Sequence, residues 1–191
     1  MSALSIERIS VEDYFEIERT SQERYEYVHG EIFAMAGASD KHNIISANTF
    51  SSLHAQVRKR PCFAYNNDMR VRFSPTHYSY PDIAVVCGEK QIDVYPLDTL
   101  LNPTVIIEVL SSSTETSDKT NKARDFRALA SIQEYLFIAQ DEIYIEHYAR
   151  HDTHKWLLRE ITELSATIEL KSIACTLLVD DIYEKIEFLQ S

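Results

Sequence analysis

The sequence predicts an α+β protein in which a central mixed sheet is flanked by helices, and three observations point to it. A stretch from Ser39 to about Arg58 repeats apolar residues at helical spacing. Three short segments rich in β-branched and aromatic residues follow, CFAYN, DMRVRFS and YPDIAVVC. The run PTVIIEVLS is a nearly continuous apolar strand, which is typical of a strand covered on both faces. At 191 residues, 45% of them hydrophobic, the chain fits a single domain over residues 1–191.

The N-terminal part predicts a helix followed by a hairpin. Ser10 is a suitable N-cap for a helix over about 11–19, whose first turn carries Glu12 and Asp13. The segment YEYVHGEIFAMA then alternates around a His29–Gly30 pair, which indicates two strands joined by a tight turn. Glu31 is expected directly after that turn.

The C-terminal part predicts a helix, a strand and a second hairpin. A helix is expected to begin between Ser112 and Thr116 and to run to about Ala130. The apolar strand EYLFI and a hairpin formed by IYIEHYAR and HKWLLREI follow it, and LVDDIYEKIEFL predicts a short closing helix. Each segment therefore has an expected place in one mixed sheet with helices on its faces.

Composition narrows the possible functions and surroundings. A net charge of -11 repels a polyanion unless cations gather locally, although Arg70 and Arg72, or the cluster at 58–60, could face phosphate. Three scattered cysteines suggest neither a disulfide framework nor a zinc site, which favours a reducing, cytoplasmic setting. No apolar run approaches the roughly 20 residues of a membrane span. Gly-rich phosphate loops, nucleophile elbows and dinucleotide fingerprints are missing as well.

Two carboxylates interrupt apolar strands, and they are the strongest functional signal. Glu108 lies inside TVIIEVL, where a buried charge is costly unless it is paired or bound to metal. Asp82 follows Pro81 at the start of the strand IAVVC. Two acids on neighbouring strands, with water and a substrate phosphate, suffice for Mg²⁺ or Mn²⁺. A structural ion pair or a capped strand end is the competing explanation, and from the residues alone a functional site and a structural role are about equally favoured.

The pair Pro81–Asp82 followed by Glu108, Val109 and Leu110 resembles the signature of the PD-(D/E)XK nuclease superfamily. That resemblance implies a restriction-endonuclease-like fold. The match departs at Leu110, where the signature has lysine. Lys122 is the expected replacement, because on the following helix it shares a face with Phe126 and Leu129. A solvated surface lysine is the alternative for Lys122.

An ordered set of further segments resembles the Uma-two family of restriction-endonuclease-like proteins. The segments are YEYVHGEIFAMAGAS, KHN, IIEVLSSSTETSDKTNKARDF and IQEYLFI. The resemblance adds Glu31 and His42 as candidates for contact with metal or phosphate, although either could be an ordinary surface residue. It implies a metal-dependent endonuclease that acts on DNA, with Asp82 and Glu108 as metal ligands and Lys122, Glu31 and His42 assisting.

Two other functions stay open from the sequence. The chain could keep the nuclease fold as an inactive DNA-binding or protein-binding module, which the -11 charge and the missing lysine at 110 would suit. It could also cleave RNA or a small nucleotide. A homodimer is a weaker expectation, since cutting both strands of a duplex is simplest for a two-fold pair.

Overall fold

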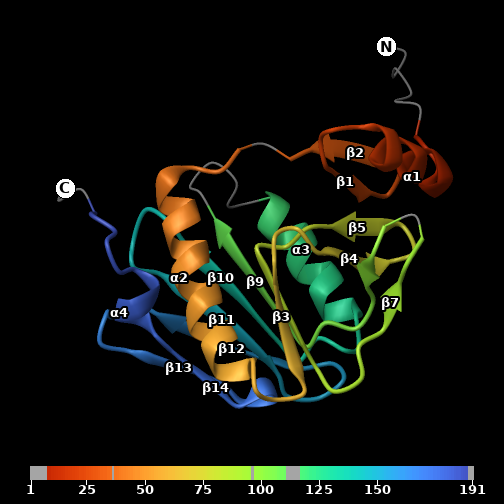
Figure 1. Ribbon diagram of the computed structural model, residues 1–191. Helices are drawn as coiled ribbons and strands as arrows, with labels where there is room; N and C mark the ends of the chain where they lie inside the picture. The colour runs from red at the N-terminus through yellow and green to blue at the C-terminus, as the bar shows by residue number, and fades with distance from the viewer. Residues whose placement is uncertain (1–7, 36, 96, 111–116, 189–191) are drawn as a thin grey trace, which may run out of the picture.

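The computed structural model describes residues 8–35, 37–95, 97–110 and 117–188. Its central sheet has six strands in the order β12-β11-β10-β9-β6-β3 (Figure 1). The strands β9 and β10 are parallel and the other pairs antiparallel, so the sheet is mixed, as predicted. In chain order these strands are β3 (Cys62–Asn66), β6 (Ile83–Cys87), β9 (Val105–Leu110), β10 (Glu134–Ala139), β11 (Ile145–Arg150) and β12 (Trp156–Ile161).

A second six-stranded sheet packs beside the central one, in the order β2-β1-β5-β4-β8-β7. Its members are β1 (Tyr25–Val28), β2 (Glu31–Ala34), β4 (Arg70–Ser74), β5 (His77–Ser79), β7 (Ile92–Asp93) and β8 (Thr99–Leu100). A separate antiparallel pair is formed by β13 (Thr167–Leu170) and β14 (Cys175–Leu178). The prediction gave one sheet, and the structure divides the strands among three.

Three of the helices cover the two faces of the central sheet, and the N-terminal helix packs on the second sheet. The structure has α1 (Val11–Thr20), α2 (Asp40–Val57), α3 (Ser117–Ala128), α4 (Val179–Ile182) and a 3-10 turn at Lys171–Ile173. One face packs with α2 and α4 in a core that includes Ile45 and Ile107, and the other packs with α3 in a core that includes Ile106 and Phe126. Figure 1 shows α2 across the near face, with α3 beyond it toward β4 and β5.

The N-terminal helix and hairpin are confirmed with their sequence signals. Ser10 caps α1 through its hydroxyl, which accepts a hydrogen bond from the Asp13 backbone N–H at 3.0 Å, while the Asp13 carboxylate accepts the Ser10 N–H in return. The turn between β1 and β2 has φ of 52° at His29 and 98° at Gly30. Two successive positive φ angles match the right-handed twist of hairpin strands, which explains the short connection.

Three details of the element prediction differ from the structure. The consecutive strands β3 and β4 lie in different sheets, because β3 pairs with β6 while β4 pairs with β5 and β8. The closing helix is a single turn, α4, whose Val179 and Ile182 are buried. The predicted start of the helix at 112–116 lies outside the described residues, and α3 is described from Ser117.

The expectation that no disulfide forms is wrong in this structure. Cys62 and Cys87 are bonded across the antiparallel pair β3–β6, where they occupy directly opposed positions. The third cysteine, Cys175, is a free, buried thiol. Spacing along the chain gave no sign of the bond, because the strand register brings together two residues 25 positions apart.

Among the described residues, no helix is both long and apolar enough to cross a membrane.

Candidate active site

The two predicted acids meet where β6 begins and β9 nears its end. These strands are antiparallel, with Ile83 opposite Ile107, so continuing the register by one residue sets Asp82 beside Glu108. Both side chains are nearly buried, with 11% of Asp82 and 7% of Glu108 exposed. The prediction that the acids occupy adjacent strands is confirmed.

Asp82 is held by two donors on a single oxygen. Its Oδ2 accepts a hydrogen bond from the Val109 backbone N–H at 2.7 Å and lies 3.1 Å from the Nε2 of His42. His42 stands in the first turn of α2, whose N-cap Ser39 accepts the His42 N–H. The capped start of α2 therefore fixes the imidazole against the acid and leaves the second carboxylate oxygen of Asp82 outside these two contacts.

Glu108 is a buried acid facing α3. Strand alternation sets it on the same face as Ile106 and Leu110, which both belong to the core that includes α3. Its Oε2 lies 3.3 Å from the Nζ of Lys122, whereas its Oε1 is buried without a hydrogen-bond partner. Burial raises the pKa of Glu108 to about 8, the negative charges of Asp82 and Glu26 add to the rise, and Lys122 opposes it. A cation bound beside Glu108 would favour the ionised carboxylate, because its positive charge opposes the effects of burial and of the neighbouring acids.

Lys122 reaches Glu108 from the middle of α3. Ala123 and Phe126 of this helix are buried in the core, which fixes the helix against β9. Only 13% of the lysine side chain is exposed, and its Nζ also lies 3.9 Å from Glu26 Oε1. The structure thus places the Lys122 ammonium against Glu108, and its role in place of a lysine at position 110 stays a prediction.

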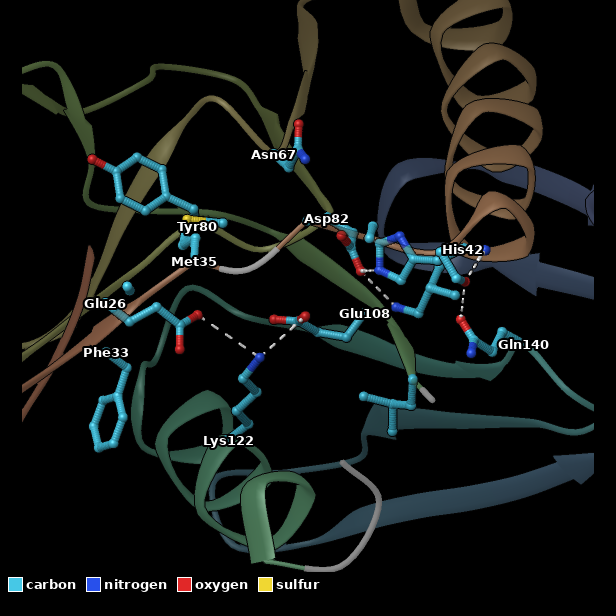
Figure 2. Close-up of a pocket in the computed structure, with 16 residues that line it drawn as sticks. Glu26, Phe33, Met35, His42, Asn67, Tyr80, Asp82, Glu108, Lys122 and Gln140 are labelled. Carbon is cyan, nitrogen blue, oxygen red and sulfur yellow. Dashed lines mark hydrogen bonds and ion pairs between the residues drawn. The ribbon is translucent and has the colours of Figure 1, made fainter. Parts of the chain in front are cut away.

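These residues line a cleft of about 430 Å³. Figure 2 shows Asp82 and His42 on one side, Lys122 below, Glu108 between them, and Glu26 and Phe33 on the far side. The wall comes from β1 and β2, the segment leading into α2, the starts of β4 and β6, the ends of β9 and β10, and α3. Its members are Glu26, Phe33, Ala34, Met35, Gly37, Ala38, Ser39, His42, Asn67, Tyr80, Asp82, Glu108, Val109, Leu110, Lys122 and Gln140.

The structure brings four of the five candidate residues together. Asp82, Glu108, Lys122 and His42 line the cleft, and Glu31 does not. Glu31 is exposed and opposes Val28 next to the turn, whereas the Phe33–Glu26 pair further along the same hairpin reaches the cleft.

Sequence reasoning missed Glu26, which takes the place expected for Glu31. Its Oε1 accepts a hydrogen bond from the Ser79 hydroxyl and approaches Lys122. The signal that could have found it is the hairpin register, because Glu26 opposes Phe33 and therefore lies on the same face as Glu31. Only the position of α3 decides which of these two acids meets the lysine.

Three arginines of the two basic clusters, Arg60, Arg70 and Arg72, have partners within the protein, whereas Arg58 and Lys59 are exposed. Arg70 is 1% exposed and donates to the Thr99 hydroxyl and the Leu97 carbonyl, with Glu18 at 3.6 Å. Arg60 donates to the backbone carbonyls of residues 173 and 174. Arg72 is partly exposed and lies 3.9 Å from Asp93. Of these side chains, two are structural and the third already has an acidic neighbour.

A mixed sheet lies between helices, with an acid at the start of one strand and a second acid on its antiparallel neighbour, which agrees with the restriction-endonuclease-like fold predicted from the sequence. The chain matches the family model Uma2, described as "Putative restriction endonuclease", over residues 11–179. It therefore belongs to the Uma2 family.

Two curated relatives and a solved structure are similar to the chain over most of its length. The uncharacterized protein slr1290 of Synechocystis sp. is 31% identical over 182 residues, covering 95% of this chain and 94% of the relative. A second Synechocystis protein, sll1609, is 33% identical over 162 residues, covering 84% and 92%. A crystal structure from Anabaena variabilis, described as a "putative nuclease belonging to DUF820", superposes with a TM-score of 0.67 at 21% identity, covering 85% of this chain and 91% of that one. At this identity the superposition shows a shared fold.

Proposed function

We propose that the protein is a metal-dependent endonuclease that hydrolyses phosphodiester bonds in DNA. The observation that carries the proposal is the buried Glu108, which has one oxygen on Lys122 and one without a hydrogen-bond partner, beside Asp82 in an open cleft. A site that only stabilised the fold would not need an unsatisfied buried carboxylate oxygen. The description of the Uma2 family and the nuclease description of the Anabaena protein support the same class of reaction.

The donor set of the cleft suits Mg²⁺ or Mn²⁺. Among the described residues, no group of three or more His, Cys, Asp and Glu side chains is arranged to hold a metal. Mg²⁺ is instead held in many phosphate-processing sites by one or two carboxylates, water and the substrate itself. Asp82 and Glu108 would be these ligands, and the bare Oε1 of Glu108 is a hard oxygen without another partner. When bound, the cation supplies positive charge to the phosphate and makes nearby water more acidic.

The other residues of the cleft orient these groups and stabilise charge. The Lys122 ammonium is positioned to donate to a phosphate oxygen as negative charge develops on it, because its aliphatic stem is packed and its head reaches Glu108. His42 fixes the orientation of Asp82 through Nε2, and the Val109 N–H holds the same oxygen. Glu26 keeps Lys122 inside the cleft from the opposite side. The nucleophile in this proposal is water.

One observation favours a second function, an inactive module that keeps the fold. Of the described residues that line the cleft, Lys122 is the only lysine or arginine, and the whole chain has a charge of -11. A protein that cleaves duplex DNA usually binds its backbone through many basic side chains. Binding without cleavage would support this alternative.

Cleavage assays separate the two functions. Supercoiled plasmid, single-stranded DNA and RNA would be incubated with the purified protein in Mg²⁺, Mn²⁺ or EDTA. Wild type is expected to cleave DNA only with metal, and Asp82→Ala and Glu108→Ala are expected to remove this activity while the fold stays intact by circular dichroism. The matched control is Glu163→Ala, at an exposed acid outside the cleft, which should cleave like wild type. Activity that survives in Glu108→Ala would refute the proposed site, and metal-independent binding without cleavage by wild type would favour the module.

A further inference from the structure

The cleft is poor in positive charge for a site that would hold a polyanion. Its described lining carries three carboxylates, Glu26, Asp82 and Glu108, against the single ammonium of Lys122. One divalent cation would offset these acids and leave little surplus for further phosphates. Nearby cations are engaged elsewhere, with Arg24 on Asp68 and Lys41 over the Phe188 ring at 5.7 Å. Phosphate contacts, the usual source of affinity for duplex DNA, are therefore scarce here.

The same cleft has an open aromatic wall. Phe33 lines it and is 49% exposed, although a large apolar ring is ordinarily placed inside the protein. Among the described strands, β2 has a neighbour on one side only, so one edge of this wall has no adjoining strand. Met35, half-buried, lines the cleft two residues further along. Both side chains therefore contribute apolar area to the lining of the cleft.

The aromatic wall lies next to the reacting groups. Phe33 is directly opposite Glu26 in the β1–β2 register, so the two side chains emerge on the same face of the hairpin. Glu26 in turn approaches Lys122, which contacts Glu108. Figure 2 shows Phe33 beside Glu26 and Lys122, with the pair Asp82 and His42 across the cleft. A nucleotide whose phosphate meets the acids would bring its base toward this ring.

We propose that the cleft takes an unpaired nucleotide, with its base stacked on Phe33, and that the protein therefore prefers single-stranded DNA to duplex DNA. This inference rests on the proposed function for the identity of the polymer. Stacking on an aromatic ring is available to every base once it is unpaired, whereas both faces of a base are occupied inside a duplex. Met35 adds a flexible, polarisable side chain to the lining of the same cleft. Stacking in this way compensates for the few phosphate contacts.

Equilibrium binding tests the inference without turnover. Fluorescence anisotropy would compare a labelled single strand with the matched duplex at one fixed salt concentration, with Ca²⁺ in place of Mg²⁺. Wild type is expected to bind the single strand more tightly. Phe33→Ala is expected to weaken single-strand binding by about 5- to 100-fold, the equivalent of one lost stacked base, and to leave duplex binding within about twofold. Phe33→Trp, which keeps a stacking surface, should bind like wild type.

The matched control is Phe63, which is 43% exposed and lies on β3, the edge strand of the central sheet, outside the cleft. Phe63→Ala should leave both affinities unchanged, and thermal melting of each variant checks its folding. Equal binding of single strand and duplex by wild type, no measurable binding of either, or equal losses in Phe33→Ala and Phe63→Ala would each overturn the inference. Stacking-dependent binding without cleavage would uphold it and refute only the nuclease proposal. Cleavage that is equally fast on single-stranded and duplex DNA, and that Phe33→Ala does not change, would uphold the nuclease proposal and refute the preference for single strands.

Discussion

Replacing Glu108 by glutamine should stabilise the metal-free protein while it removes cleavage. Burial raises the pKa of Glu108 from 4.5 to about 8. The folded protein then keeps a proton that the unfolded chain releases, so this group lowers stability as the pH rises from about 4.5 to about 8. At about 1.4 kcal/mol per pH unit, the full loss is about 5 kcal/mol. Glutamine keeps the shape of the side chain and does not ionise.

The expected gain is smaller than that full loss, because the substitution also takes a partner from Lys122. This ammonium is 13% exposed and keeps Glu26 at 3.9 Å after losing the contact at 3.3 Å with Glu108. An uncompensated buried charge costs several kcal/mol, so we expect a net stabilisation of about 2 kcal/mol at pH 8.5. At pH 4.5 the gain should vanish or change sign, because Glu108 is then protonated in the folded protein.

Urea unfolding in EDTA at several pH values measures this difference. The control is Glu163→Gln at an exposed position, which should stay within about 0.5 kcal/mol of wild type at every pH. Mg²⁺ should raise the midpoint of wild type and leave Glu108→Gln nearly unchanged, because ligand binding to the folded state adds to its stability. A variant that is less stable than wild type at pH 8.5, or a difference that does not depend on pH, would refute the reasoning about this carboxylate.

Three further perturbations test other contacts of the structure. Lys122→Met, which keeps the packed stem and removes the charge, should slow single-turnover cleavage about 10²- to 10³-fold with little change in DNA affinity, and a loss below tenfold would remove Lys122 from the chemistry. His42→Ala should raise the Mg²⁺ concentration needed for half-maximal cleavage by about 10- to 100-fold, because it removes one of the two contacts that orient the Asp82 carboxylate. An unchanged metal titration would contradict that role. Replacing Cys62 and Cys87 together by alanine should lower the free energy of unfolding by about 3 kcal/mol, as expected for a disulfide that closes a loop of 25 residues. Thiol counting on the denatured, non-reduced wild type should find only Cys175 reactive.

Much of the candidate site could be predicted from the sequence because local chemistry marks it. Burying a carboxylate in an apolar strand costs free energy wherever the strand lies, unless the charge has a partner. This cost identified Glu108 and Asp82 from the sequence. Alternation on β9 assigned Glu108 and Leu110 to one face, and helical spacing gave Lys122 the side of α3 that packs with Phe126. The capping signal at Ser10 predicted where α1 starts, since a cap depends only on nearby residues.

What depends on register and on packing between segments came only from the tertiary structure. Glu26, and not Glu31, meets Lys122 because α3 packs nearer to the open end of the hairpin than to its turn. Arg70 is a charged residue in the alternating segment MRVRF, which suggests an exposed position. It is nevertheless buried beside Glu18, because β4 belongs to the second sheet and not to the central one. Cys62 and Cys87 are bonded because β3 and β6 pair in the register that opposes them. The sequence by itself determined which residues need partners, and the tertiary structure decided which partners they meet, because contacts between distant segments depend on how whole strands and helices pack.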